Sequence, residues 1–467
     1  MIKIQRELEF GSLFSQKQIE GRLMKKLISL IFTLTILVFQ MNLYSQKIFP
    51  FEIKEHKLSN GLKVIVVPYN SPGIVAYYTV VRTGSRNEVE PGKTGFAHFF
   101  EHMMFRGTEK YSDVEYNRIL KLLGADSNAW TSNDQTVYHI VASADALETI
   151  VDIESDRFKN LKYNKEQFQT EAGAILGEYN KSALNPFQIL NEEMQKLAFT
   201  THTYRHTTIG FLEDIKDMPN QYDYSLQFFD RYYRPEYCTI IVVGDVSFNK
   251  VIYLIEKYYG DWKRGSFEPN IPAEPEQKEE RSKEVKYPNK TLPYLYIGYK
   301  VPAFDSKSKD VAALNVISEL LFSETSELYQ KLVLDEKLVD FISGEMPMDR
   351  DPSLFRIYTR VKDEKNVERV KQEIYNAIEK LKLEQVSPKK LADVLSNMKY
   401  SFLHSLDNAD AIASTLAYYV SVTGNPYSLD EFYQTLASLT PDDIQQTARK
   451  YLVKEKRNVV TLISGGN

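Results

Sequence analysis

Two histidines and a glutamate stand close together in the stretch His98-Phe99-Phe100-Glu101-His102. On an α-helix, side chains four residues apart lie on one face, about 6 Å from each other, so both imidazoles can reach one metal ion. At about 100° per residue, Glu101 falls about 60° to the other side of His98, at the edge of the same face. The spacing therefore predicts a metal held by two imidazoles, with a carboxylate beside it.

The opposite half of this helix is apolar. It consists of Phe96, Phe99, Phe100, Met103 and Met104. One face is therefore predicted to carry chemistry and the other to join the core. Thr94 is expected to cap the start of the helix, and Gly107 to end it after Arg106.

A metal, a water and a base are the reagents that hydrolyse a peptide bond. The order of residues reverses the commoner His-Glu-x-x-His and is typical of an inverted zinc-peptidase motif. Two imidazoles and a carboxylate suit zinc among the divalent metals. The alternative is a pair of histidines satisfied by hydrogen bonds in an ordinary helix.

A catalytic zinc takes three protein ligands and leaves one position open. Glu171 and Glu178 are the best candidates for the third ligand, because seven residues apart they share one face of a helix predicted over 165–181. One could bind the metal while the other orients a ligand. Spacing alone does not choose between these and three other glutamates, and most helix glutamates are simply solvated. The three are Glu148, Glu154 and Glu166.

Composition indicates an ordinary globular chain with two or more domains. The 467 residues include 58 Lys and Arg against 63 Asp and Glu, for a net charge of −5. Since there is no large basic block, nucleic acid is not expected as a partner. The single cysteine, Cys238, lies in an apolar run that predicts a buried strand, and one cysteine forms no intramolecular disulfide.

The N-terminal region resembles a secretory signal. Met24-Lys25-Lys26 precedes a 13-residue apolar run from Leu27 to Phe39, which is short for a bilayer span. Cleavage is expected after Ser45, so residues 24–45 are predicted to be a signal peptide and 1–23 an upstream mis-start extension. An uncleaved anchor is the alternative. A secreted chain without disulfides fits a bacterial periplasm, with no stable membrane insertion after cleavage.

The remainder predicts two tandem domains of mixed α and β structure. An N-terminal zinc-peptidase domain is expected over 50–265, a charged and proline-containing linker over 266–287, and a C-terminal homologous domain without the metal motif over 288–467. Near residues 228–244 and 447–465 a helix ending in an aromatic residue leads into a final strand, which suggests two copies of one unit. Strands are expected over 51–68 around an Asn60-Gly61 turn, 74–81, twice within 128–143, 237–246 and 294–299; helices over 113–123, 146–160, 165–181, 223–232 and 308–321.

The motif, the distal pair Glu171 and Glu178, and further stretches together resemble the insulinase/pitrilysin family of zinc peptidases, which includes the mitochondrial processing peptidase. The further stretches are Asn128-Ala129-Trp130-Thr131-Ser132, Tyr232-Tyr233-Arg234-Pro235 and Gly244-Asp245-Val246. The resemblance runs from about residue 50 to the C-terminus. It implies two α+β domains per chain, each an antiparallel sheet flanked by helices. It also implies that four such domains close as two halves around a chamber.

The resemblance also implies roles for individual residues. His98, His102 and Glu178 would bind one zinc per chain, Glu101 would be the general base that deprotonates the attacking water, and Glu171 would support the site from behind the ligands. Asn128 and Ala129 would present edge-strand backbone to an extended peptide.

One stretch departs from the family pattern. In single-chain active members the second domain supplies an arginine and, seven residues on, a tyrosine that contact the substrate carbonyl. Val333 and Asp340 occupy those places here. The chain is therefore predicted to be the metal-bearing subunit of a heterodimer whose partner brings the Arg/Tyr pair; a homodimer is the milder alternative.

The sequence thus predicts a periplasmic, zinc-dependent endopeptidase that acts on peptides or unfolded segments. The alternative from another class is a non-catalytic interaction or assembly subunit of the same fold. His202 and His206 are also four apart, but their polar, β-branched setting favours a loop over a second metal site.

Overall fold

The structure is a computed structural model and describes residues 47–465. The predicted mis-start extension and signal peptide, 1–23 and 24–45, lie outside the described residues. Residues 49–465 belong to one compact unit. Within 47–465, no helix has both the length and the apolar character that crossing a bilayer requires.

The first sheet has six strands, in the order β1-β2-β6-β3-β5-β4. All neighbours are antiparallel except β2 and β6, which run parallel. Strand β4 therefore lies at one edge. The strands are β1 (Lys54–Lys57), β2 (Lys63–Pro68), β3 (Ile74–Val81), β4 (Asp126–Thr131), β5 (Thr136–Ser143) and β6 (Cys238–Gly244).

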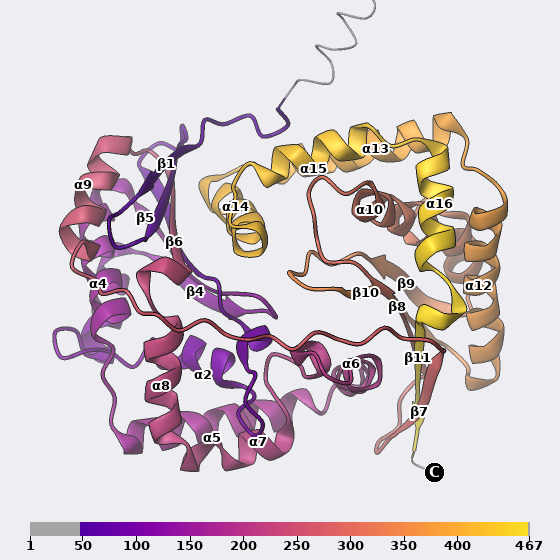
Figure 1. Ribbon diagram of the computed structural model, residues 1–467, viewed down its shortest axis with the longest axis horizontal. Helices are drawn as coiled ribbons and strands as arrows, with labels where there is room; N and C mark the ends of the chain where they lie inside the picture. Colours follow the sequence, from indigo (N-terminus) through magenta and orange to yellow (C-terminus); the bar gives the residue numbers. More distant parts are fainter. Residues whose placement is uncertain (1–46, 466–467) are drawn as a thin grey trace, which may run out of the picture. The chain divides into compact units, whose positions relative to one another are not determined.

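Helices of the first half cover this sheet and extend beyond it (Figure 1). They are α2 (Phe96–Met103), α3 (Asp113–Leu123), α4 (Leu147–Asn160), α5 (Lys165–Ser182), α6 (Pro186–Ala198), α7 (Leu212–Asp217), α8 (Tyr222–Tyr232) and α9 (Phe248–Tyr259). The helices predicted over 113–123, 146–160, 165–181 and 223–232 correspond to α3, α4, α5 and α8.

The second sheet repeats the topology of the first. Its order is β7-β11-β8-β10-β9, with β7 and β11 parallel and the other neighbours antiparallel. The strands are β7 (Arg281–Tyr287), β8 (Tyr294–Val301), β9 (Val339–Glu345), β10 (Ser353–Val361) and β11 (Arg457–Ser464). Matching β2-β6-β3-β5-β4 to this order strand by strand confirms two tandem copies of one α+β unit, each with one parallel pair that the sequence did not indicate.

Strand β7 occupies the last seven residues of the stretch predicted as linker. Its charged sequence does not indicate a strand, because β7 is an edge strand whose side chains are mostly exposed. The helices of the second half are α10 (Lys309–Phe322), α11 (Glu327–Tyr329), α12 (Val367–Leu383), α13 (Pro388–His404), α14 (Ala409–Thr423), α15 (Ser428–Ala437) and α16 (Pro441–Tyr451).

The two halves exchange helices. Helix α6 of the first half packs on β7, β8 and β11 of the second sheet, and helix α14 of the second half packs on β3 and β6 of the first (Figure 1). One hydrophobic core joins Leu190 and Met194 of α6 to Leu354, Val460 and Leu462 of the second sheet. Since α6 follows α5 after three residues, the exchange anchors the helix that carries Glu171 and Glu178.

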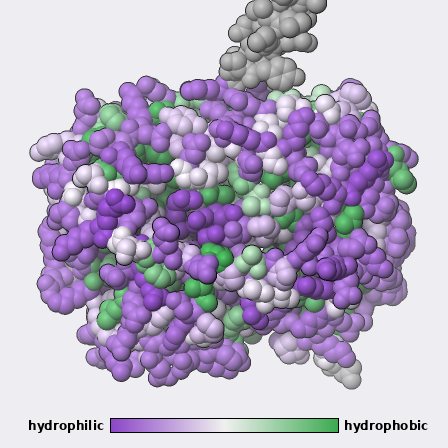
Figure 2. All heavy atoms as spheres, in the orientation of Figure 1, coloured by the Kyte–Doolittle hydropathy of each residue, from purple (hydrophilic) through white to green (hydrophobic). Residues whose placement is uncertain are grey.

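The face drawn in Figure 2 is covered mostly by hydrophilic side chains, with small, scattered apolar patches. Scattered apolar residues are normal on a globular surface and do not mark an interface.

A buried amine lies where α6 ends against the second sheet. The Nζ of Lys300 sits 3.4 Å from the centroid of the Phe199 ring and has no hydrogen-bond partner among the described residues. Burial lowers the pKa of Lys300 to about 7, although Glu274 opposes this.

We expect Lys300→Met to stabilise the fold below pH 7 and to lose that advantage as the pH rises toward 10.5. Since the folded-state pKa is lowered, the folded chain binds fewer protons than the unfolded chain between these values, so wild-type stability rises with pH there. The difference between the two chains should shrink by about 2 kcal/mol between pH 7.5 and 9.5. Urea melts at both pH values measure it; a pH-independent difference would contradict the assignment.

Candidate metal centre

Helix α2 presents the motif with its apolar side turned inward. Phe96, Ala97, Phe99, Phe100 and Met103 are buried in the first core. The predicted Thr94 cap is wrong: α2 begins after Gly95, and the Thr94 hydroxyl instead donates to Asp214 Oδ2 and accepts from the Phe211 amide. The helix also ends at Met103, before the predicted stop after Arg106, since Met104 to Arg106 form turns.

The structure brings His98, His102 and Glu178 together across α2 and α5. Their ligand atoms all lie within 4.8 Å of one another. His98 Nε2 is 3.6 Å from one carboxylate oxygen of Glu178, and His102 Nε2 is 3.5 Å from the other. These three residues are the only group of this kind in the described part of the chain.

These distances fit a tetrahedral zinc. Two ligand atoms that each lie about 2.0–2.1 Å from such a metal are about 3.4 Å apart. Both imidazoles present Nε2, so the donor set is two imidazole nitrogens and one carboxylate. The Glu178 side chain is 45% exposed, so the open side of the site faces solvent.

The electrostatics of the two imidazoles differ. Burial, together with the neighbouring His102, lowers the pKa of His98 to about 4, so this ring is neutral at physiological pH, as a metal ligand must be. The hydrogen bond with Glu171 raises the pKa of His102, against the effect of burial.

Glu171 is buried behind His102. Its Oε1 lies 2.9 Å from His102 Nδ1, and its Oε2 accepts from Arg106 Nε at 2.5 Å. Burial alone would raise the pKa of Glu171, but the hydrogen bonds from His102 and Arg106 outweigh it, and the pKa is lowered. An ionised Glu171 fixes the proton of His102 on Nδ1 and leaves Nε2 free for a metal.

We expect Glu171→Gln to weaken zinc binding by roughly 10- to 100-fold, the usual cost of losing the group behind a histidine ligand. The amide lacks the charge that holds His102 and Arg106. Competition with a fluorescent chelator measures the affinity. Glu166→Gln, on the exposed first turn of the same helix, is the matched control; equal affinities for both variants would contradict the role of Glu171.

Glu101 lies beside the ligands and next to the edge strand. Its Oε2 accepts a hydrogen bond of 2.6 Å from Thr131 Oγ1, at the end of β4. Burial raises the pKa of Glu101, and the Thr131 hydroxyl partly offsets this. A carboxylate with a raised pKa is a better proton acceptor, which suits a general base.

Asn128 and Ala129 lie on β4, the edge strand that packs against α2. Asn128 is exposed and Ala129 is nearly buried. Because an edge strand leaves one row of backbone groups unpaired in the sheet, an extended peptide could pair with β4 beside Glu101.

The other glutamates left open by spacing are engaged elsewhere. Glu154 is buried with Arg157 and Tyr116, Glu148 contacts Lys257, and Glu166 is exposed at the start of α5. His202 and His206 flank a short 3-10 turn and do not form a metal cluster within residues 47–465.

Sequence reasoning missed two residues that contact the site. Arg106 lies beyond the end of α2, where helical spacing does not apply, so no sequence pattern indicates its contact with Glu171. Thr131 falls within the Asn128–Ser132 stretch, but nothing in its type indicates contact with Glu101.

The positions that depart from the family pattern carry no suitable donor. Val333 lies in a π-helical turn, Gln330–Asp335. Asp340 lies on β9, where its carboxylate accepts from Arg360 Nε at 2.6 Å.

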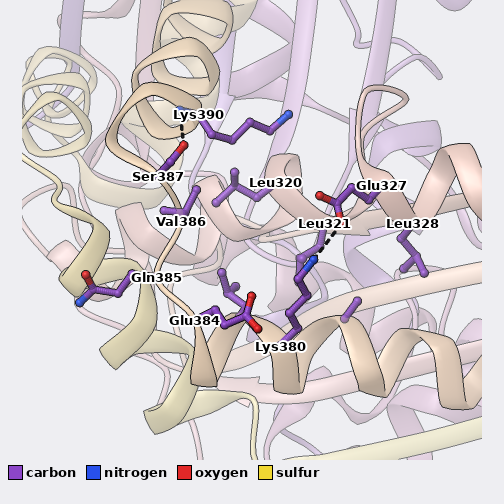
Figure 3. Close-up of a pocket in the computed structure, with 12 residues that line it drawn as sticks. Leu320, Leu321, Glu327, Leu328, Lys380, Glu384, Gln385, Val386, Ser387 and Lys390 are labelled. Atoms are coloured by element: carbon purple, nitrogen blue, oxygen red, sulfur yellow. Dashed lines mark hydrogen bonds and ion pairs between the residues drawn. The ribbon is translucent and has the colours of Figure 1, made fainter.

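A cavity of about 430 Å³ in the second half is lined by residues of α10 to α13, which are drawn in Figure 3. Its lining includes Leu320, Leu328 and Leu381, with Lys380 and Glu327 paired at the rim. It contains none of the candidate metal ligands, so it is separate from the centre described above.

Comparison with known proteins agrees with the geometry. Residues 64–210 match the family model described as insulinase (peptidase family M16), and residues 221–398 match the model described as peptidase M16 inactive domain. The zinc protease PqqE of Helicobacter pylori is 30% identical over 413 residues, which cover 87% of this chain and 91% of that protein. The chain belongs to the insulinase (M16) family.

Two further similarities of this M16 chain concern its fold and its first half. A crystal structure of a protease from Helicobacter pylori, 30% identical, superposes with a TM-score of 0.82 and covers 88% of this chain and 99% of that one. The beta subunit of the mitochondrial-processing peptidase of Bos taurus is 28% identical over 267 residues, 56% of this chain and 53% of that protein. The inactive-domain match covers most of α10 to α13, where the second half has no metal motif.

Proposed function

We propose that this M16 chain is a zinc-dependent endopeptidase that hydrolyses peptides or unfolded segments. The convergence of His98, His102 and Glu178 at tetrahedral spacing carries the proposal. The similarity to a protein named as a zinc protease supports it. When bound, zinc would polarise the scissile carbonyl and lower the pKa of the attacking water.

The chain's own residues supply the remaining chemistry. Glu101 takes the proton from the attacking water on its carboxylate and returns it to the leaving amine, while Thr131 holds the carboxylate in place. Glu171 keeps the His102 ring oriented through Nδ1. Backbone pairing along Asn128 and Ala129 aligns an extended substrate, so recognition depends mainly on main chain.

We also propose that the active form is a heterodimer in which a homologous partner supplies the missing arginine and tyrosine. Val333 and Asp340 support this, because neither side chain can donate a hydrogen bond to a substrate carbonyl at neutral pH. The relative named as subunit beta of a processing peptidase is also consistent with paired subunits.

We expect the purified chain alone to turn over a peptide roughly 100- to 1000-fold more slowly than its complex, the usual effect of losing one donor to the oxyanion. Activity is titrated against a candidate partner that has the Arg/Tyr pair and lacks the zinc motif. Saturation at one partner per chain supports the heterodimer. Full turnover by the chain alone refutes it, and the molecular mass in solution then identifies a homodimer or a monomer.

The experiment also separates the enzyme from a non-catalytic assembly subunit. An assembly subunit would bind its partner without turnover and without stoichiometric zinc. For localisation, we propose the periplasm on the basis of the predicted signal peptide, and N-terminal sequencing of the mature protein should give Gln46 as the first residue.

A further inference from the structure

The buried side chain of Glu88 binds backbone amides at the start of helix α2. Glu88 Oε2 accepts from the Gly95 amide and Oε1 from the Ala97 amide, each at 2.7 Å. Gly95 is the N-cap residue, has φ +92°, and offers no side chain to do this itself. A carboxyl group at a helix N-terminus satisfies amides that have no partner within the helix. It therefore fixes the turn that holds His98.

Glu88 is itself held by a short 3-10 turn, Ser85–Asn87. The Ser85 and Arg86 amides donate to the Ser132 and Asn133 carbonyls, at 3.3 and 2.8 Å, in the turn that follows β4. The turn therefore links the edge strand to the carboxyl group that caps α2.

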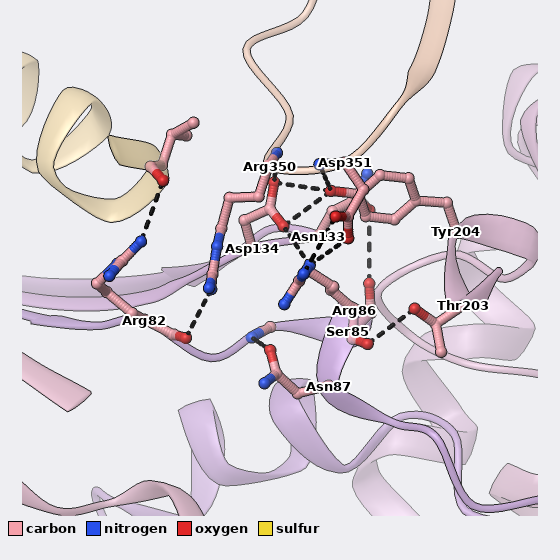
Figure 4. Close-up of polar contacts among 12 residues, drawn as sticks. Arg82, Ser85, Arg86, Asn87, Asn133, Asp134, Thr203, Tyr204, Arg350 and Asp351 are labelled. Atoms are coloured by element: carbon pink, nitrogen blue, oxygen red, sulfur yellow. Dashed lines mark hydrogen bonds and ion pairs between the residues drawn. The ribbon is translucent and has the colours of Figure 1, made fainter. Parts of the chain in front are cut away.

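The second half reaches into this turn through an ion pair (Figure 4). Arg86 donates to Asp351 from Nε at 2.5 Å and from a second nitrogen at 3.1 Å. Asp351 lies in the loop between β9 and β10, and only 23% of its side chain is exposed. Burial alone would raise the pKa of Asp351, but hydrogen bonds from His202 and Arg86 lower it, so the pair is ionised.

Neighbouring contacts reinforce this junction. The Tyr204 hydroxyl donates to Asp134 of the turn after β4 and accepts from the Asp351 amide at 3.3 Å. The Arg350 amide donates to Asp134 Oδ2 at 2.9 Å (Figure 4). The β9–β10 loop is thus bonded to both segments that border the candidate site.

We propose that Asp351, acting through Arg86 and Glu88, is a positioning residue that sets the placement of helix α2 and hence of the metal ligands. The second half, which has no metal motif, thereby affects the position of the candidate metal ligands in the first half. The contacts form one continuous path: Asp351, Arg86, the 3-10 turn, Glu88, and the amides beside His98. This inference rests on the proposed metal centre.

The test compares Asp351→Asn with Asp410→Asn. Asp410 of α14 also reaches across to the first half, where it accepts from the Tyr78 hydroxyl at 2.7 Å, but it contacts neither the 3-10 turn nor α2. In the full chain we expect Asp351→Asn to weaken zinc affinity by about tenfold, measured by chelator competition. We also expect amide exchange to accelerate in the peptide spanning residues 94–99, measured on the metal-free protein. Asp410→Asn should change neither, and Asp351→Glu, which keeps the carboxylate, should restore most of both.

Equal zinc affinity and equal exchange at 94–99 in Asp351→Asn and Asp410→Asn would overturn the proposal. If Asp351→Asn fails to fold, Arg86→Lys provides the same comparison, because it keeps the charge and loses the paired hydrogen bonds. The exchange measurement needs neither metal nor turnover. A wild-type chain that binds no zinc would thus defeat the proposed function, while the exchange rates would still decide the role of Asp351.

Discussion

A Glu178→Ala chain is expected to purify without zinc and to lose peptidase activity by at least about 100-fold. Within residues 47–465, Glu178 supplies the only carboxylate that faces both Nε2 atoms, at 3.5 and 3.6 Å. Its removal leaves two imidazoles, which is one ligand short of a catalytic zinc site. Metal analysis of the purified protein and turnover of a quenched-fluorescent peptide, with the partner present, measure the two effects.

The matched control is Glu166→Ala, which removes a glutamate from the same helix at an exposed position. It should keep one zinc per chain and full activity. Because the Glu178 side chain is 45% exposed, its removal should not destabilise the fold, and unchanged urea melts would show this. Stoichiometric zinc in Glu178→Ala would overturn the assignment of the third ligand.

Glu101→Gln is expected to keep its zinc and lose activity by about 100- to 10,000-fold, the range that a general base contributes. The amide has the same shape and can still contact Thr131, but it cannot take a proton from water. Chelator competition should therefore give a near-wild-type affinity, while kcat falls and KM stays similar.

Glu178→Ala and Glu101→Gln should therefore differ in whether the protein keeps its zinc. If Glu101→Gln lost zinc as well as activity, Glu101 would be a metal ligand rather than the general base. A neighbouring substitution, Thr131→Val, should have a smaller effect, because it removes one hydrogen bond from the Glu101 carboxylate and leaves the base itself.

Local patterns in the sequence predicted much of helix α2 and its surroundings. The i, i+4 histidines and the apolar stripe on the same helix are set by helical geometry alone, so α2 could be placed before the structure was known. Helix α3 agrees with its predicted range at both ends, Asp113 and Leu123, because Ser112 caps it and Gly124 ends it in a left-handed conformation. Choosing Glu171 and Glu178 among five glutamates needed the family resemblance.

Contacts between segments that are distant in the chain could not be predicted from local patterns. The α2 cap comes from Glu88, seven residues before Gly95, through a loop whose path the sequence does not reveal. The apolar stripe of α6 indicates an amphipathic helix but not which sheet it covers, and it covers the other half's sheet. Strand β7 depends on parallel pairing with β11, more than 160 residues away, and its own residues look like a solvated linker.

The exchange of α6 and α14 makes each half depend on the other for its fold. If the second half were removed, the first sheet would lose the cover that α14 provides, and α6 would expose its apolar side to water. The buried apolar positions of the second half are therefore also required for the stability of the first half.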